Sequence, residues 1–146
     1  MVDDLYQEII IDHSKHPRNC HAMADANRKA EGYNPLCGDE LKLYVKIEND
    51  IVKDVSWVGS GCAISTASAS LMTESLKGKS RPEALKLLEN FHELLTTDTP
   101  VTQELGKLVV FCGVRDYPAR VKCATLAWHT LKSALMNSGE PVVSTE

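Results

Sequence analysis

Residues 40–59 read ELKLYVKIENDIVKDVSWVG and carry the clearest structural pattern of the chain. Every second residue from Leu41 to Ile47 is apolar, and charged or aromatic residues stand between them. Asn49-Asp50 forms a turn signal, after which apolar residues resume at Ile51, Val55 and Trp57. A period of two on both sides of a short polar turn predicts a β-hairpin with one buried face.

Upstream of the hairpin, the sequence predicts a helix and then an extended segment. Asp3 to about Lys15 has apolar residues at helical spacing, and Pro17 ends that pattern. Residues Arg18 to Asn34 are polar and weakly patterned, which indicates a loop followed by an edge strand.

Downstream of the hairpin the pattern becomes helical. Gly78 stops the first predicted helix, and Ser80 with Glu83 forms a capping box that starts the second. The three predicted helices cover Cys62 to about Lys77, Ser80 to about Leu95, and Val121 to Asn137, with a linker over Thr96 to Thr102. A hairpin followed by helices predicts an α+β fold, a small antiparallel sheet of about three strands with helices on one face. We expect one domain over residues 1–138 and a flexible C-terminal tail over residues 139–146.

The composition excludes several classes of function. The 146 residues suffice for one domain with a real core, and 43% of them are hydrophobic. A formal net charge of −4 argues against a general nucleic-acid binder. The chain has neither the basic, apolar start of a signal peptide nor an apolar run long enough for a membrane span. We therefore expect a cytoplasmic protein, in which the five cysteines stay reduced.

Three cysteines and one aspartate stand out as metal-ligand candidates. Cys37 and Asp39 share one turn around Gly38, and Cys62 opens a predicted helix, whose positive end favours a thiolate. We expect Cys123 in the first turn of the last helix, where Arg120 and Lys122 would favour its thiolate as well. Three thiolates and a carboxylate suit zinc or an iron–sulfur cluster.

Spacing alone leaves an ordinary structural interpretation open. No Cys-x-x-Cys occurs, and a cysteine is often only a small core residue. We interpret Cys20 and Cys112 in that way. His13, His16 and His21 suggest a partner surface or a solvated cluster, whereas His92 and His129 suit structural roles. A hydrolase pair of Cys62 with His129 also remains open.

Three motifs together resemble the IscU/SufU/NifU-N family of iron–sulfur cluster assembly scaffolds. They are Asn34-Pro-Leu-Cys-Gly-Asp39, Gly59-Ser-Gly-Cys-Ala-Ile-Ser65 and Arg120-Val-Lys-Cys-Ala-Thr-Leu-Ala-Trp128. The likeness runs from Leu5-Tyr6 to about Leu135 and implies a SufE/NifU-like fold. It also implies that Cys37, Asp39, Cys62 and Cys123 bind the metal, supported by Arg120 and Lys122.

Two features resemble the SufU branch of this family. Lys122 stands where the housekeeping scaffolds carry histidine, and the stretch between Cys62 and Cys123 is longer, with Thr96 to Pro118 as the extra segment. The resemblance implies a zinc-dependent sulfurtransferase partnered by a SufS-like cysteine desulfurase, which displaces Cys37 from the zinc. Cys37 would then be catalytic, accepting sulfur for downstream assembly or acceptor proteins.

Two alternatives use the same residues. The first is a scaffold that assembles and hands on a [2Fe–2S] cluster, with Asp39 keeping the cluster labile. The second is a structural zinc module without sulfur chemistry, because four closed ligands are typical of structural zinc.

Overall fold

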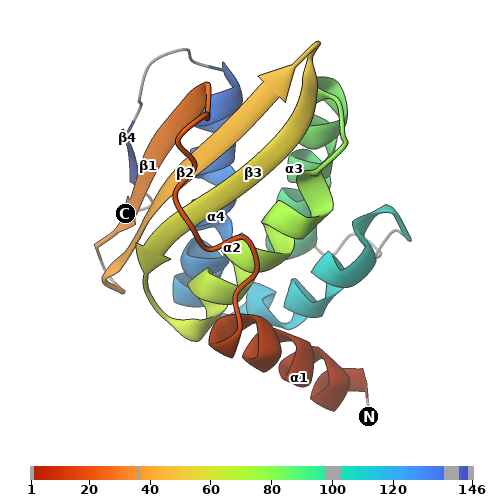
Figure 1. The fold of residues 1–146 in the computed structure, drawn as a ribbon. Coiled ribbons are helices and arrows are strands. Elements are labelled where there is room, and N and C mark those ends of the chain that lie inside the picture. The colour runs from red at the N-terminus through yellow and green to blue at the C-terminus, as the bar shows by residue number, and fades with distance from the viewer. Residues whose placement is uncertain (1, 36, 98–102, 137–141, 145–146) are drawn as a thin grey trace.

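The computed structural model describes residues 2–35, 37–97, 103–136 and 142–144. Along the chain the elements are α1 (Val2–Lys15), β1 (Arg28–Asn34), β2 (Asp39–Glu48), β3 (Ile51–Ser60), α2 (Ala63–Leu76), α3 (Arg81–Thr96), the 3₁₀ segment η1 (Gln103–Asp116), α4 (Pro118–Met136) and β4 (Val142–Ser144). The sheet lies on one side and the helices gather on the other, so the predicted α+β class is confirmed (Figure 1).

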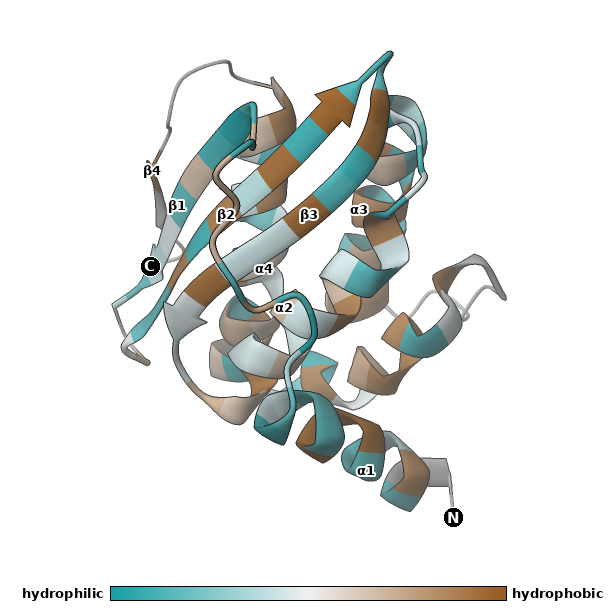
Figure 2. Cartoon of the chain, viewed as in Figure 1, coloured by the Kyte–Doolittle hydropathy of each residue, from teal (hydrophilic) through white to brown (hydrophobic). Residues whose placement is uncertain are grey.

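The hairpin forms as predicted, with a turn of two left-handed residues. Asn49 and Asp50 have φ values of 52° and 62°, which asparagine and aspartate tolerate better than most residues. Hydrophobic and hydrophilic residues alternate along β2 and β3 (Figure 2). The register shifts between Lys46 and Ile47, and as a result Val52 rather than Ile51 is fully buried in the second strand.

The sheet has one strand more than predicted. Its order is β3-β2-β1-β4, in which the first three strands are antiparallel and β4 pairs in parallel with β1. Residues 137–141 and 145–146 of the chain's end lie outside the described residues. Within the segment expected to be a tail, Val142–Ser144 pair with Glu31–Tyr33 and continue the sheet.

Helices α2 and α4 pack closely because α2 carries small side chains. Ser68 is fully buried, and its hydroxyl accepts a hydrogen bond of 3.1 Å from Trp128 Nε1 of α4. Helix α3 starts with the predicted capping box between Ser80 and Glu83. These local signals set the helix boundaries, and burial of the shared faces sets their packing.

An aromatic cluster attaches η1 to the helices. Phe91 of α3 stacks on Trp128 with ring centroids 4.5 Å apart and meets Phe111 of η1 edge-on at 5.7 Å. The described part of the predicted extra segment is therefore packed structure that contributes to the core.

Candidate metal centre

The turn between β1 and β2 presents Cys37 and Asp39. Gly38 adopts a φ of 71°, and the backbone N–H of Cys37 donates to the carbonyl of Asn34 at 3.3 Å. Asn34 and Asp39 face each other as the last pair of the ladder between the two strands. The turn leaves the Cys37 side chain exposed while Asp39 is only 2% exposed.

Asp39 is held by hydrogen bonds on both carboxylate oxygens. Oδ1 accepts the backbone N–H of Cys62 at 2.8 Å, and Oδ2 accepts from Asn34 Nδ2 at 3.2 Å. A Cβ at position 61 would lie 2.5 Å from Oδ1, so only glycine permits this approach. The carboxylate of Asp39 is therefore fixed between β1 and the start of α2.

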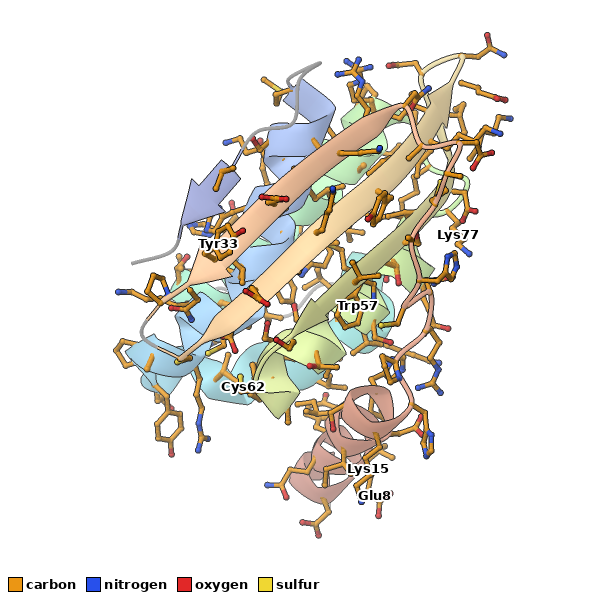
Figure 3. The ribbon with its side chains drawn as sticks, turned by 60° about the vertical axis from the view of Figure 1, so that its left-hand side comes forward. Glu8, Lys15, Tyr33, Trp57, Cys62 and Lys77 are labelled. Carbon is orange, nitrogen blue, oxygen red and sulfur yellow. The ribbon has the colours of Figure 1, made fainter. Side chains whose placement is uncertain are left out.

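Cys62 caps helix α2, in agreement with its predicted place at the start of that helix. Its Sγ accepts the N–H of Ser65 at 3.4 Å and lies 4.0 Å from Asp39 Oδ2. In Figure 3, Cys62 lies where the end of β3 meets α2. The cap brings the thiol and the carboxylate to the same point.

Cys123 differs from its prediction in two ways. Because α4 already begins at Pro118, Cys123 lies in the second helical turn, away from the helix end. Burial, the neighbouring Asp39 carboxyl and the thiols of Cys37 and Cys62 raise the pKa of Cys123 in the metal-free protein. The expected lowering by nearby cations is wrong, because the side chain is only 3% exposed and faces other acidic groups.

The two predicted supporting residues lie in different surroundings. Arg120 is exposed, its guanidinium lies 4.7 Å above the ring of Tyr117, and it lines the cavity beside the cysteines. Lys122 is half-buried and is not among the residues that line this cavity.

Three of the four predicted donors lie together, and the fourth, Cys62, lies beside one of them. One ligand atom each from Cys37, Asp39 and Cys123 lies within 4.8 Å of the other two, and Cys62 adjoins Asp39. A tetrahedral zinc site with bonds of about 2.0–2.3 Å places its ligand atoms roughly 3.3–3.8 Å apart. Small side-chain shifts would thus close this donor set around one ion, and its soft thiolates fit zinc or iron–sulfur chemistry.

The thiols open onto a cavity of about 790 Å³. Its walls include apolar side chains of α1 and η1, among them Ile10 and Val114. Cys112 also lines it and is half-buried, so the small-core interpretation holds for it only in part. Cys20 lies outside the cavity lining and is exposed, so the same interpretation is wrong for that residue.

Sequence reasoning missed the role of Asn34. Its side chain is fully buried, and Nδ2 donates to both Asp39 Oδ2 and Cys123 Sγ. The residue was visible as the first position of the Cys37 motif, but only the fold shows that it reaches α4.

The histidines take no part in this centre. His13 is 2% exposed, and its Nδ1 lies 2.7 Å from Ser70 Oγ of α2, so the expectation of a solvated or partner-facing residue is wrong. The ring of His129 lies against that of His92, with centroids 6.0 Å apart. His129 is not among the residues lining the cavity, so the structure gives no support to a hydrolase pair with Cys62.

Among the described residues, none of the helices combines the length and apolar character that a membrane span requires.

Comparison with known proteins agrees with the geometry. The model of the NifU-like N terminal domain family matches residues 5–137. Iron-sulfur cluster assembly scaffold protein IscU of Streptococcus pyogenes serotype M1 is 41% identical over 94% of this chain and 86% of its own length. Zinc-dependent sulfurtransferase SufU of Bacillus subtilis is 39% identical over 92% of this chain and 91% of its own length.

Solved structures show the same relationship. The crystal structure of FiSufU from Fervidobacterium islandicum AW-1 superposes with a TM-score of 0.84 at 38% identity, covering 92% of this chain and 99% of that one. A NifU-like N-terminal structure from Brucella abortus has the same TM-score at 23% identity and 92% and 94% coverage, which supports the fold alone. By its motifs, its fold and these matches, the chain belongs to the NifU-like N terminal domain family.

Proposed function

We propose that this protein is a zinc-dependent sulfur acceptor in iron–sulfur cluster assembly, and that Cys37 takes persulfide sulfur from a cysteine desulfurase. The observation that carries this proposal is the unequal exposure of the four donors. Cys37 is exposed, whereas Asp39 and Cys123 are 2% and 3% exposed and Cys62 is half-buried. One donor is thus accessible to a partner while the others stay behind it.

The more buried donors are also the more firmly held by hydrogen bonds. Asp39 accepts hydrogen bonds from β1 and α2, and Cys62 caps a helix. Cys37 lies on a short turn beside Gly38, where rotation of one side chain moves the thiol without disturbing an element. Of the four donors, Cys37 would therefore leave a bound metal with the smallest disturbance of the surrounding structure.

The transfer step needs a thiolate at neutral pH. Zinc, when bound by Cys37, Asp39, Cys62 and Cys123, would keep these thiols deprotonated without redox activity. The Cys37 thiolate attacks the terminal sulfur of the partner's cysteine persulfide. The partner's S–S bond breaks, its electron pair leaves on the partner's cysteine thiolate, and Cys37 retains the sulfur as a persulfide.

The similarity to the zinc-dependent sulfurtransferase of Bacillus subtilis supports the zinc over the cluster assignment. Lys122 in place of a histidine agrees with that branch. The apolar cavity beside the thiols gives a partner loop a place to dock near Cys37. The proposal places the protein in the cytoplasm, where thiols stay reduced.

Alanine production by a cysteine desulfurase tests the proposal. Zinc-loaded protein should stimulate turnover, and chelator-stripped protein should not. Cys37→Ala should abolish stimulation, whereas Cys20→Ala, at an exposed cysteine outside the cavity lining, should retain it. Full stimulation by the zinc-loaded Cys37→Ala protein would refute the proposal.

A second candidate function is a scaffold for a [2Fe–2S] cluster on the same four residues. The carboxylate of Asp39 among three thiols favours it, because a harder ligand weakens a soft cluster site and aids release. The similarity to IscU of Streptococcus pyogenes agrees with this alternative. Anaerobic reconstitution with iron and sulfide should yield a stoichiometric, transferable cluster if it is correct.

A further inference from the structure

We propose that Asn34 is a positioning residue of the metal centre, whose side-chain amide holds Asp39 and Cys123 in place for the ion. This inference rests on the ligand set of the proposed function. Nδ2 of Asn34 lies 3.2 Å from Asp39 Oδ2 and 3.5 Å from Cys123 Sγ. An amide nitrogen has two hydrogens, so it can donate to both atoms at once.

The orientation of the amide follows from the charges around it. Turning the amide over would place Oδ1, an acceptor, against the Asp39 carboxylate and the Cys123 sulfur. Both of these atoms are acceptors once ionised, so only the nitrogen suits that side. Oδ1 is buried and has no hydrogen-bond partner among the described residues. The fold retains this unsatisfied acceptor and keeps both donor contacts.

The backbone of Asn34 contributes a third contact. Its carbonyl accepts the N–H of Cys37 at 3.3 Å, which closes the turn that carries Cys37. One fully buried residue at the end of β1 therefore touches Cys37 through its backbone and two further donors through its side chain.

These contacts divide the donors into fixed and movable ones. The amide joins Asp39 of β2 to Cys123 of α4, two elements that approach only in the folded chain. Hydrogen bonds to metal ligands orient them and favour their charged forms. Within the described residues, the Asn34 amide makes no hydrogen bond to the side chain of Cys37. It therefore holds the two buried donors and leaves the Cys37 side chain free to move.

Metal affinity and the spectrum of a cobalt-substituted protein test this role. Asn34→Asp keeps the side-chain size but places a carboxylate against Asp39 and Cys123, and Asn34→Ala removes the donor. We expect each to weaken zinc binding by about 10–100-fold in a competition titration with a chelator. The thiolate-to-cobalt charge-transfer band should also shift, which loss of packing remote from the ion would not cause.

Asn27→Asp is the matched control. Asn27 is exposed and bonds to the backbone of Ile47, at the far end of β2 from Asp39. This variant should bind zinc and cobalt as the wild-type protein does. Wild-type affinity and spectrum in folded Asn34→Asp and Asn34→Ala would overturn the inference.

A measurement on the wild-type protein covers the case in which both variants fail to fold. In ¹⁵N-labelled protein, the side-chain amide signals of Asn34 should shift on zinc loading far more than those of Asn27. Equal shifts would overturn the inference. If the wild-type protein bound neither zinc nor cobalt, both the proposed function and this inference would fail. If the wild-type protein bound the metal and the Asn34 variants bound it equally well, the inference alone would fail.

Discussion

Asp39 Oδ1 accepts the backbone N–H of Cys62 at 2.8 Å, which joins the first residue of β2 to the N-cap of α2. The same carboxylate lies 4.0 Å from the Cys62 thiol through its other oxygen. One residue thus serves as a candidate ligand and also fixes the backbone of another candidate ligand. The centre is therefore expected to respond as a unit to changes at either residue.

Gly61→Ala should disrupt this relationship. The added methyl would lie 2.5 Å from Asp39 Oδ1, so the carboxylate must move and lose its bond to Cys62. We expect zinc affinity to fall by roughly 10–100-fold, as for other losses of ligand support. Gly113→Ala is the control, because a methyl there meets no heavy atom of the described residues within 4 Å beyond its chain neighbours and the backbone of its own helix. Equal affinities in the two variants would contradict the prediction.

The cysteines should differ in their rates of alkylation by iodoacetamide. In metal-free protein, exposed Cys37 should react well before Cys123, which is buried and whose pKa is raised by that burial. Zinc loading should protect Cys37 and leave the exposed Cys20 unaffected, as peptide mass spectrometry would show. Equal protection of Cys20 would indicate a general loss of accessibility instead of metal binding.

The protein should lose stability in mild acid. Burial lowers the pKa of His13 and of His129 in the folded state, below the value of about 6.5 in the unfolded chain. The unfolded chain therefore takes up protons first, and the free energy of unfolding decreases as the pH falls below about 6.5.

Urea denaturation of the metal-free protein between pH 7.5 and 5.5 measures this effect. His13→Gln and His129→Gln should each reduce the pH dependence of the unfolding free energy. An unchanged slope in both the His13→Gln and the His129→Gln variant would show that other groups cause the acid sensitivity.

Ser80→Ala should lower stability without affecting the centre. Ser80 Oγ accepts the N–H of Glu83 at 3.2 Å, and Glu83 Oε1 accepts the N–H of Ser80 at 3.1 Å. Loss of such a cap costs about 1 kcal/mol of unfolding free energy. Ser75→Ala is the control, since the Ser75 hydroxyl donates to the carbonyl of Leu71 inside α2, where alanine favours the helix. Thermal unfolding should show a lower midpoint temperature for Ser80→Ala and not for Ser75→Ala. Zinc titration should show an unchanged affinity in both variants.

Local patterns predicted most of the elements because the signals that form them are local. Alternation from Leu41 to Ile47, the Asn49-Asp50 turn and the capping box at Ser80 each involve residues close in the chain, and all three appear in the structure. The prediction was less accurate where contacts between elements intervene. The start of α4 at Pro118 placed Cys123 one turn deeper, and β4 formed by pairing with β1, which is remote in sequence.

The amino-acid sequence predicts the α+β class, the hairpin, the approximate positions of the helices, and the motifs that carry Cys37, Asp39, Cys62 and Cys123. Tertiary packing brings these donors near one another, since they come from a turn, a helix cap and the interior of another helix. It also decided which of them is exposed and that Asn34 links two of them. Burial and hydrogen bonding between remote segments arise from packing, which short-range patterns do not specify.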